Sequence, residues 1–248
     1  MDRPVFLVAG ASSGMGRLAA LKLGQGEGHI ILAARRIEPL EEAAERIRSA
    51  GGSAEAMAFD GADPQSVEAM IAQIASSHGR LDGAFNNLGH TFGDSPLHET
   101  PLERWHDALA VNLSAVFYLM RSQIPLMLAN GGGRIVNNSS TGGLRGTRNM
   151  SDYSAAKWGL IGLTKSAALE YASQNVIINV IAPGIIATEK FSQFEAQMPE
   201  LFERLRQETP VGRFGEMREI AEVVDWLLRE APAYLAGSVI PVDGGRTA

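Results

Sequence analysis

Tyr153 and Lys157, four residues apart, are the side chains of this sequence best placed to move a proton. At this spacing both lie on one face of a helix. A phenol is a weak acid, with an ordinary pKa of about 10, and a nearby ammonium group favours its ionised form. The pair therefore predicts a tyrosine that acts as a general acid or base, although two such residues also share a face on many ordinary helices.

A serine that could hold a substrate oxygen precedes this helix. The strand-like run Arg134–Asn138 is followed by Ser139 and Ser140, and Ser140 stands thirteen residues before Tyr153. The end of a parallel strand lies at the edge of the sheet beside the start of the next helix. We expect the hydroxyl of Ser140 to hold the substrate oxygen while Tyr153 transfers the proton.

A glycine-rich turn follows the first apolar run of the chain, Val5–Ala9. Gly10 permits a sharp turn from strand to helix, Gly14 lets main-chain N–H groups approach a pyrophosphate, and Gly16 lets the helix pack tightly on the sheet. The diphosphate would lie at a helix N-terminus, which favours an anion. The glycine spacing differs from the more common dinucleotide motif, so a plain turn is the alternative, which the position between strand and helix disfavours.

Two arginines follow the second apolar run, Ile30–Ala34, where a dinucleotide site reads the adenosine ribose. An acidic residue there would accept hydrogen bonds from the 2′-hydroxyl of NAD, whereas Arg35 and Arg36 suit the 2′-phosphate of NADP. The first carboxylate comes only at Glu38. The sequence therefore favours NADPH, with NADH possible if both arginines are only solvated loop charges.

These candidate residues lie beside short apolar runs that alternate with segments of helical period. Several runs are continuously apolar, which is typical of parallel strands covered on both faces. The expected strands are Val5–Ala9, Ile30–Ala34, Ala54–Phe59, Leu81–Asn86, Arg134–Asn138, Val176–Ile181 and Ser238–Val242. The expected helices include Gly14–Leu23, Leu40–Ala50, Pro64–Ser77, Leu102–Asn130 and Tyr153–Ser173. The predicted fold is an α/β, Rossmann-type, doubly wound parallel sheet of seven strands with helices on both faces, in a single domain of residues 1–248.

The segment between Gly184 and Val211 breaks the alternation, because it carries no strand pattern. Its apolar residues recur at spacings of three and four, as on one helical face: Phe191, Phe194, Met198, Leu201, Phe202 and Leu205. An insertion beyond the end of a strand lies where a doubly wound sheet binds its ligand. We expect a lid over Glu189–Arg206, in an insertion of about residues 189–209; a surface helix packed on the domain is the alternative.

Bulk composition excludes several classes of protein. The formal net charge is −6 and the basic residues are scattered, so nucleic acid is not an expected partner. The absence of cysteine excludes disulfides and thiolate catalysis. No apolar run approaches the roughly 18 residues of a membrane span, and Met1–Pro4 leads directly into a strand-like run without a signal peptide. We expect a cytoplasmic protein with no membrane contact and no bound metal.

With these motifs in this order, the sequence resembles the short-chain dehydrogenase/reductase family in its compact single-domain form, and is similar to the 3-oxoacyl-carrier-protein-reductase-like members. The resemblance covers nearly the whole chain. Asn86–Gly89 resembles the stretch after the family's fourth strand, and Pro183–Thr188 resembles the turn that receives the nicotinamide carboxamide. Asp243–Gly245 resembles the family's tail.

The resemblance implies a catalytic tetrad of Asn112, Ser140, Tyr153 and Lys157. Ser140 would orient the substrate oxygen and Tyr153 would be the general acid or base. Lys157 would lower the phenol pKa and bind the nicotinamide ribose, and Asn112 would support a water that links Lys157 to solvent. The resemblance also implies a larger cofactor-binding set: Gly10, Ser12, Ser13, Gly14, Met15, Gly16, Arg35, Arg36, Asp60, Gly61, Asn87, Gly89, Tyr153, Lys157, Pro183, Gly184, Ile186 and Thr188.

Three positions depart from the family pattern. Ala9 replaces the usual threonine, Leu88 replaces a small alanine, and Gly61 replaces a branched apolar residue. All three lie near the expected cofactor and none belongs to the tetrad. They bear on cofactor affinity rather than on the class of reaction.

The expected function is an NAD(P)-dependent oxidoreductase that transfers a hydride between the cofactor and a small-molecule carbonyl compound or secondary alcohol, foremost an NADPH-dependent ketoreductase. An NAD-linked alcohol or sugar dehydrogenase and a non-catalytic dinucleotide-binding regulator are the alternatives. The helices Leu102–Asn130 and Tyr153–Ser173 carry apolar residues on more than one face. Together with the resemblance, this pattern predicts a homotetramer.

Overall fold

The computed structural model describes residues 3–188 and 195–248. Its main sheet has seven parallel strands in the order β3-β2-β1-β4-β5-β6-β9. The strands are β1 (Val5–Ala9), β2 (His29–Ala34), β3 (Ser53–Ala58), β4 (Gly83–Asn86), β5 (Gly133–Asn138), β6 (Val176–Pro183) and β9 (Val239–Val242). This is the predicted doubly wound α/β sheet, and the seven predicted strands are confirmed.

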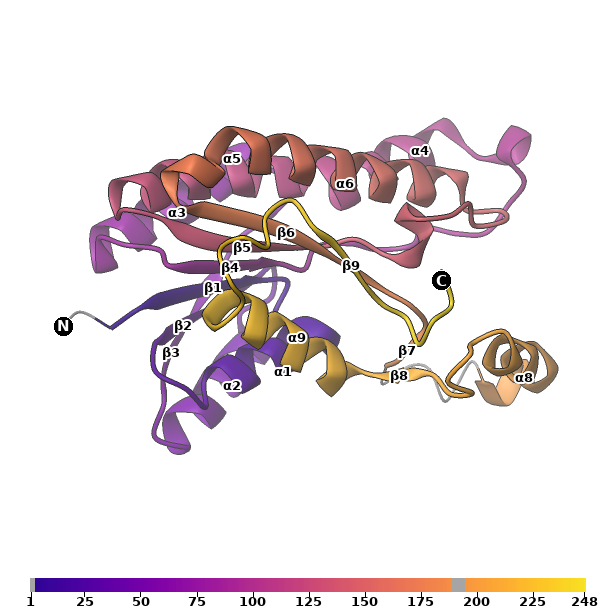
Figure 1. Ribbon diagram of the computed structural model, residues 1–248, viewed down its shortest axis with the longest axis horizontal. Coiled ribbons are helices and arrows are strands. Elements are labelled where there is room, and N and C mark those ends of the chain that lie inside the picture. The colour runs from indigo at the N-terminus through magenta and orange to yellow at the C-terminus, as the bar shows by residue number, and fades with distance from the viewer. Residues whose placement is uncertain (1–2, 189–194) are drawn as a thin grey trace.

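Helices cover both faces of this sheet (Figure 1). One layer consists of α1 (Gly14–Leu23), α2 (Glu38–Ser49) and α9 (Met217–Arg229), and the other of α3 (Pro64–His78), α4 (Leu102–Leu109), α5 (Ala115–Ala129) and α6 (Ser151–Tyr171). Every residue of β1 is buried, because alternate side chains enter the two cores: Leu7 packs in one and Val8 in the other. Burial on both faces explains the continuously apolar strands.

The strand order reverses beside β1, whose two neighbours are β2 and β4. At such a switch point the connections leave toward opposite faces of the sheet and open a crevice at the carboxyl ends of the strands. The glycine-rich turn follows β1, Gly89 follows β4 and Ser140 follows β5. Motifs far apart in the sequence therefore meet at one edge of the sheet.

The single helix predicted over Leu102–Asn130 is interrupted in the structure. α4 ends at Leu109, a π-helical turn spans Ala110–Ser114, and α5 begins at Ala115. Such a turn inserts an extra residue and is frequent at functional sites. The apolar pattern continues through it, so periodicity alone does not register the break.

Buried amides join β4 and β5 to the helices that cover them. The side chains of Asn86 and Gln123 exchange two hydrogen bonds, of 2.8 and 3.1 Å. Asn86 Nδ2 also donates to Asn137 Oδ1 at 2.9 Å, and Asn137 Nδ2 donates to Thr164 Oγ1 at 2.9 Å. Because buried polar groups are costly without partners, this network holds α5 and α6 in one register against the strands.

The segment between Gly184 and Val211 contains more order than its sequence predicts. A short strand, β7 (Ile186–Ala187), pairs in parallel with β8 (Gly215–Glu216) in a second sheet, so the expectation of no strand here is wrong. Two-residue strands are too short to leave an apolar pattern. α8 (Pro199–Gln207) follows, beyond the end of the main sheet (Figure 1).

The apolar stripe expected for the lid is only partly described. Phe191 and Phe194 lie outside the described residues. Phe202 is buried and its ring centre lies 6.0 Å from that of Phe214, whereas Met198 is 43% exposed. The stripe of α8 thus packs on the chain at Phe202 and faces outward at Met198.

Short 3₁₀ turns lie at Leu97–Glu99, Thr141–Gly143 and Ala172–Gln174. Over residues 3–188 and 195–248, the helices include none that is both long and apolar enough to cross a membrane.

Candidate active site

Tyr153 and Ser140 meet at the carboxyl edge of the sheet. Tyr153 lies in the first turn of α6, and Ser140 stands two residues after the end of β5. A hydrogen bond between the two side chains acts to lower the pKa of Tyr153, but burial acts more strongly and raises that pKa above its ordinary value. Ser139 is engaged elsewhere, because its Oγ donates to the main-chain oxygen of Lys157 at 3.0 Å. Ser140 is therefore the serine that faces the tyrosine.

Lys157 lies one helical turn further along α6 and is 2% exposed. Its Nζ donates to the main-chain oxygens of Asn138 at 2.9 Å and Leu88 at 3.3 Å, and lies 5.7 Å from the centre of the Tyr153 ring. Burial lowers the pKa of Lys157 to about 7, because the charged amine loses its water.

The direction of the phenol pKa differs from the one expected from the sequence. A fully charged ammonium at hydrogen-bond distance would lower the pKa of Tyr153, but desolvation dominates at both groups. The structure shows a phenol with a raised pKa beside an amine with a lowered one. Together the two shifts place the pKa of the phenol above that of the amine, which favours proton transfer from the Lys157 ammonium group to a Tyr153 phenolate.

Asn112 is fully buried within the π-helical turn and binds the loop after β4. Its Oδ1 accepts from His90 N at 3.0 Å, and its Nδ2 donates to His90 O at 2.9 Å. A Cβ at Gly89 would lie 2.8 Å from Lys157 Nζ and 2.9 Å from Asn112 Oδ1. The loop passes between these two side chains, so the four residues predicted as a tetrad lie around one point.

The glycine-rich turn has the geometry that its sequence predicts. Gly10 has a φ of +83°, and a Cβ there would lie 2.5 Å from the main-chain oxygen of Asn87. A Cβ at Gly16 would run into the main-chain oxygen of Gly10. Beside Gly14 the space is open, since the nearest atom to a Cβ would be Met217 Sδ at 4.0 Å. Two glycines thus allow tight packing and the third leaves room in front of α1.

The first turn of α1 offers its main-chain N–H groups to this space. The N-cap residue is Ser13, whose side chain makes no capping hydrogen bond. The first amides of a helix have no partner within the helix, so they require a cap, water or a ligand. Ser12 and Met15, the other predicted residues of the turn, are half-buried beside it. An anion fits here without any rearrangement of the cap.

Asn138 connects this turn to Lys157, and the sequence analysis missed it. Asn138 Nδ2 donates to Asn87 Oδ1 at 2.7 Å, and Asn87 Nδ2 donates to Gly10 O at 3.2 Å. The main-chain oxygen of Asn138 accepts from Lys157. Its position as the last residue of β5, before the two serines, was the available signal.

The residues expected at the adenosine end of the cofactor are exposed. Arg35 and Arg36 follow β2, and neither forms an ion pair with any residue of the described ranges. Asp60 follows β3, and its Oδ1 accepts from Ala62 N at 3.0 Å, which fixes the turn. Two unpaired guanidinium groups at this rim suit a phosphate better than a hydroxyl.

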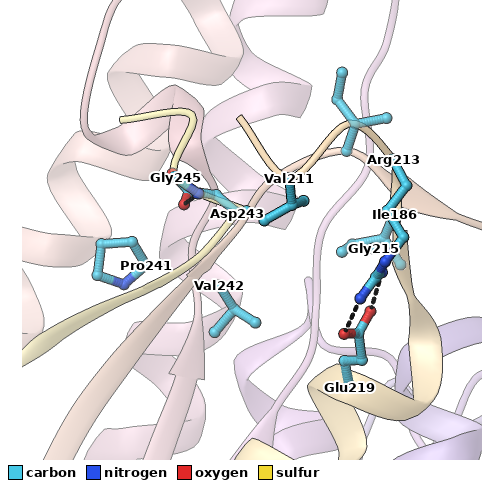
Figure 2. Close-up of a pocket in the computed structure, with 11 residues that line it drawn as sticks. Ile186, Val211, Arg213, Gly215, Glu219, Pro241, Val242, Asp243 and Gly245 are labelled. Carbon is cyan, nitrogen blue, oxygen red and sulfur yellow. Dashed lines mark hydrogen bonds and ion pairs between the residues drawn. The ribbon is translucent and has the colours of Figure 1, made fainter. Parts of the chain in front are cut away.

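The turn after β6 is held against the tail of the chain. Gly184 N donates to Val242 O at 3.0 Å, and a Cβ at Gly184 would lie 2.8 Å from the Cα of Asp243. Ile186 lines a pocket of about 260 Å³ with residues of the tail (Figure 2), whereas Thr188 is exposed. None of the four residues predicted as a tetrad, all of which are described, lines this pocket.

Comparison with known proteins agrees with this geometry. Residues 10–247 match the family model described as enoyl-(acyl carrier protein) reductase. The chain is 39% identical to cyclohexanol dehydrogenase of Acinetobacter sp. (strain SE19) over 247 residues, which cover 99% of this chain and 96% of that protein. It is 37% identical to a 3-oxoacyl-[acyl-carrier-protein] reductase of Staphylococcus aureus over 241 residues, 96% of each chain.

Among solved structures, a variant of the actinorhodin polyketide ketoreductase with NADPH superposes with a TM-score of 0.92 at 32% identity, covering 99% of this chain and 98% of that one. The chain belongs to the short-chain dehydrogenase/reductase family. It is an NAD(P)-dependent oxidoreductase that interconverts carbonyl and alcohol groups. This confirms the resemblance, the fold class and the reaction class predicted from the sequence.

Two of the departures from the family pattern compensate each other. The side chain of Leu88 occupies the space over Gly61, because a Cβ at Gly61 would lie 2.5 Å from Leu88 Cδ1. Leu88 also approaches Gly10, where a Cβ would lie 3.4 Å from Leu88 Cδ2. The large residue at 88 fills the volume that the missing side chain at 61 leaves. The packing beneath the cofactor crevice is therefore preserved.

A buried ion pair holds the loop that borders the tetrad in this family member. Arg104 Nε donates to Asp152 Oδ2 at 2.9 Å, with side chains 11% and 3% exposed. The same guanidinium donates to Ser95 Oγ at 2.9 Å and to Thr100 Oγ1 at 3.0 Å. Asp152 directly precedes Tyr153, so Arg104 ties the loop after β4 to the start of the catalytic helix. The sequence analysis named neither residue of this pair.

We predict that Gly61→Val and Leu88→Ala each destabilise the fold and that the double variant recovers most of the loss. The first overpacks the site and the second opens a cavity, each at a cost of about 2 kcal/mol. The free energy of unfolding in urea is measured for the wild type, the two single variants and the double variant. Leu102→Ala, at a 77% exposed position, is the control with little effect. Losses that simply add in the double variant would contradict the compensation.

Proposed function

We propose that the protein is an NADPH-dependent ketoreductase in which Tyr153 delivers a proton to the carbonyl oxygen of a small molecule. The observation that carries the proposal is the hydrogen bond between Tyr153 and Ser140 beside the buried Lys157. A phenol and a hydroxyl that meet at the crevice can both contact one substrate oxygen. A protein that only binds a dinucleotide does not need the hydroxyl groups of Tyr153 and Ser140 at this point, which argues against a non-catalytic dinucleotide-binding regulator.

The residues of the crevice fit a dinucleotide with a 2′-phosphate. The uncapped start of α1 and the space beside Gly14 suit a diphosphate. Arg35 and Arg36 suit the 2′-phosphate, and the similar ketoreductase contains NADPH, which supports the same choice. The other residues proposed to line the site are Gly10, Ser12, Ser13, Met15, Gly16, Asp60, Gly61, Asn87, Gly89, Pro183, Gly184, Ile186 and Thr188. The cofactor supplies the hydride when bound.

In the proposed mechanism Ser140 Oγ holds the substrate oxygen and Tyr153 Oη protonates it. Lys157 then returns a proton to the phenolate, since a pKa of about 7 allows the amine to give up a proton near neutral pH. Two of the three Nζ donors are bound to the main-chain oxygens of Leu88 and Asn138, which leaves one for this step. Asn112, held by His90, would support the water that reprotonates Lys157.

An NAD-linked alcohol or sugar dehydrogenase is the second candidate. It is favoured by the similarity to cyclohexanol dehydrogenase. The same tetrad serves both directions, because Tyr153 acts as a base in oxidation. The absence of a carboxylate directly after β2 argues for NADPH and against this candidate.

Tyr153→Phe is predicted to lower kcat about 10²–10⁴-fold, because it removes the proton donor. NADPH binding, measured by fluorescence titration, should change little. Turnover is followed by NADPH absorbance with a panel of cyclic ketones and 3-oxoacyl thioesters. The matched control is Tyr234→Phe, which removes the hydroxyl of a fully exposed tyrosine and should retain activity. A Tyr153→Phe enzyme with most of its activity would exclude Tyr153 as the acid.

Ala34→Asp is predicted to reverse a preference for NADPH. Each charge-assisted bond from arginine is worth roughly 1.5–3 kcal/mol, so one partly exposed contact gives a preference of about tenfold. An aspartate at the end of β2 would accept from a 2′-hydroxyl and repel a 2′-phosphate. The measurement is kcat/KM with both cofactors, with Arg35→Ala and Arg36→Ala beside it. Equal wild-type efficiency with NADH would mean that both arginines are only solvated.

We also propose a homotetramer assembled through α5 and α6. Much of the apolar stripe predicted on these helices is buried inside the subunit, including Ala115, Val116, Leu119, Leu160, Ala167 and Ala168. Outward-facing apolar side chains nevertheless remain: Phe117 is 45% exposed, Trp158 51% and Leu169 88%. A second subunit would cover these exposed side chains of α5 and α6.

Light scattering at micromolar concentration is predicted to give a tetramer, and Trp158→Glu should dissociate it. Trp226→Glu, on the opposite helix layer, is the matched control and should leave the mass unchanged. A wild-type monomer would refute the assembly.

Two further expectations stay proposals. We propose that the insertion of about residues 189–209 acts as a lid, and the position of α8 beyond the carboxyl edge of the main sheet supports this (Figure 1). The single-domain organisation and the cytoplasmic location likewise rest on the sequence.

A further inference from the structure

Three side chains that commonly bind transition metals meet at the end of the sheet opposite the crevice. His29 begins β2, Glu55 lies in β3, and His78 ends α3. Glu55 Oε1 lies 2.7 Å from His78 Nε2 and 3.4 Å from His29 Nε2. All three ligand atoms lie within 4.8 Å of one another. Four ligands around zinc, at about 2.0–2.1 Å from the metal, lie about 3.3 Å apart.

The imidazole of His29 is oriented toward this point by its other nitrogen. His29 Nδ1 forms a hydrogen bond of 2.8 Å with Ser53 Oγ, its cross-strand neighbour. Its Nε2 is buried and has no hydrogen-bond partner among the described residues. A buried ring nitrogen without a partner is costly, and one whose opposite nitrogen is held by a hydrogen bond has the arrangement usual for metal-binding histidines.

The charge of the cluster also suits a cation. The Glu55 carboxylate, which lies beside both imidazoles, is an anionic ligand in this cluster. The rings of His29 and His78 lie close, with centres 4.7 Å apart. Without a metal, one carboxylate oxygen faces both imidazole nitrogens, and only one of these two contacts has hydrogen-bond geometry.

We propose that His29, Glu55 and His78 form a binding site for a divalent transition metal, specifically zinc, with a water as the fourth ligand. Two imidazoles and one carboxylate are a known zinc donor set, and imidazole nitrogens favour such metals over magnesium or calcium. The expectation of no bound metal came from the sequence, in which the three residues are 23 or more positions apart.

The site is separate from the oxidoreductase centre. His29 and Ala34 are the first and last residues of β2, so about 16 Å of strand separates the metal site from Ala34, the residue before Arg35. The metal would connect the C-terminal end of α3 to β2 and to β3, which is an edge strand with one neighbour. Its role would be structural, because metal bound only by the folded chain stabilises the fold.

The test uses the full chain without a histidine tag, treated with chelator and titrated with ZnCl₂ by calorimetry. We expect one zinc per chain and a higher Tm with zinc than with chelator. His78→Asn and Glu55→Gln should weaken binding well beyond tenfold. Ser53→Ala, which keeps all three ligands, should weaken it about tenfold by releasing His29. Co²⁺ in the same site should give the visible absorption of a tetrahedral complex.

The matched control is His98→Asn, an exposed histidine beside Glu99, which should bind zinc like the wild type. Circular dichroism and NADPH titration check that each variant is folded. If a variant of one of the three ligands does not fold, the zinc affinity of Ser53→Ala tests the proposal in its place. The proposal is overturned if the wild type binds no zinc at micromolar concentration. It is equally overturned if His78→Asn, folded, binds as tightly as the wild type. Neither outcome depends on the reaction that the enzyme catalyses.

Discussion

Burying the amine of Lys157 is the constraint on which the packing at the carboxyl ends of β4 and β5 depends. An ammonium group in an apolar interior is costly unless its donors are satisfied, and here two main-chain oxygens accept from it, those of Leu88 and Asn138. These oxygens belong to the ends of two neighbouring strands, so the amine can reach both only if α6 lies close over β4 and β5. The same burial lowers the pKa of Lys157 to about 7.

Several segments pack closely around the Lys157 side chain, which explains why glycine is required at two positions far apart in the sequence. Side chains at Gly89 and Gly143 would meet Lys157 itself, at its Nζ and at its main-chain oxygen, both 2.8 Å from a Cβ. Asn138 extends the contact to Asn87, which binds the phosphate loop through Gly10. The glycine-rich turn after β1 and helix α6 are therefore positioned by one chain of hydrogen bonds. A displacement at either end would move the other.

Much of this was readable from the sequence, for a physical reason. Strands such as Val5–Ala9 are buried on both faces and leave continuous apolar runs, and Gly10 and Ser140 could be placed because each follows such a strand. What depends on contacts between distant segments was not readable. The π-helical turn around Asn112, the ion pair between Arg104 and Asp152, and the direction of the Tyr153 pKa all depend on neighbours far along the chain. The packing of the Leu88 side chain into the space over Gly61 likewise depends on a contact between distant segments.

The two ends of a parallel sheet place different demands on its residues. At the carboxyl ends the connections diverge and leave a crevice, so polar groups there can face a ligand. At the amino ends the helices return, and polar side chains must find partners in one another. Strand β2 shows the difference between its two ends. Arg35 and Arg36 are exposed just beyond its carboxyl end, whereas His29 is half-buried at its amino end. At this end His29 Nε2 is buried, forms no hydrogen bond of good geometry among the described residues and lies 3.4 Å from Glu55 Oε1, so a cation shared with that carboxylate is the partner we propose for it.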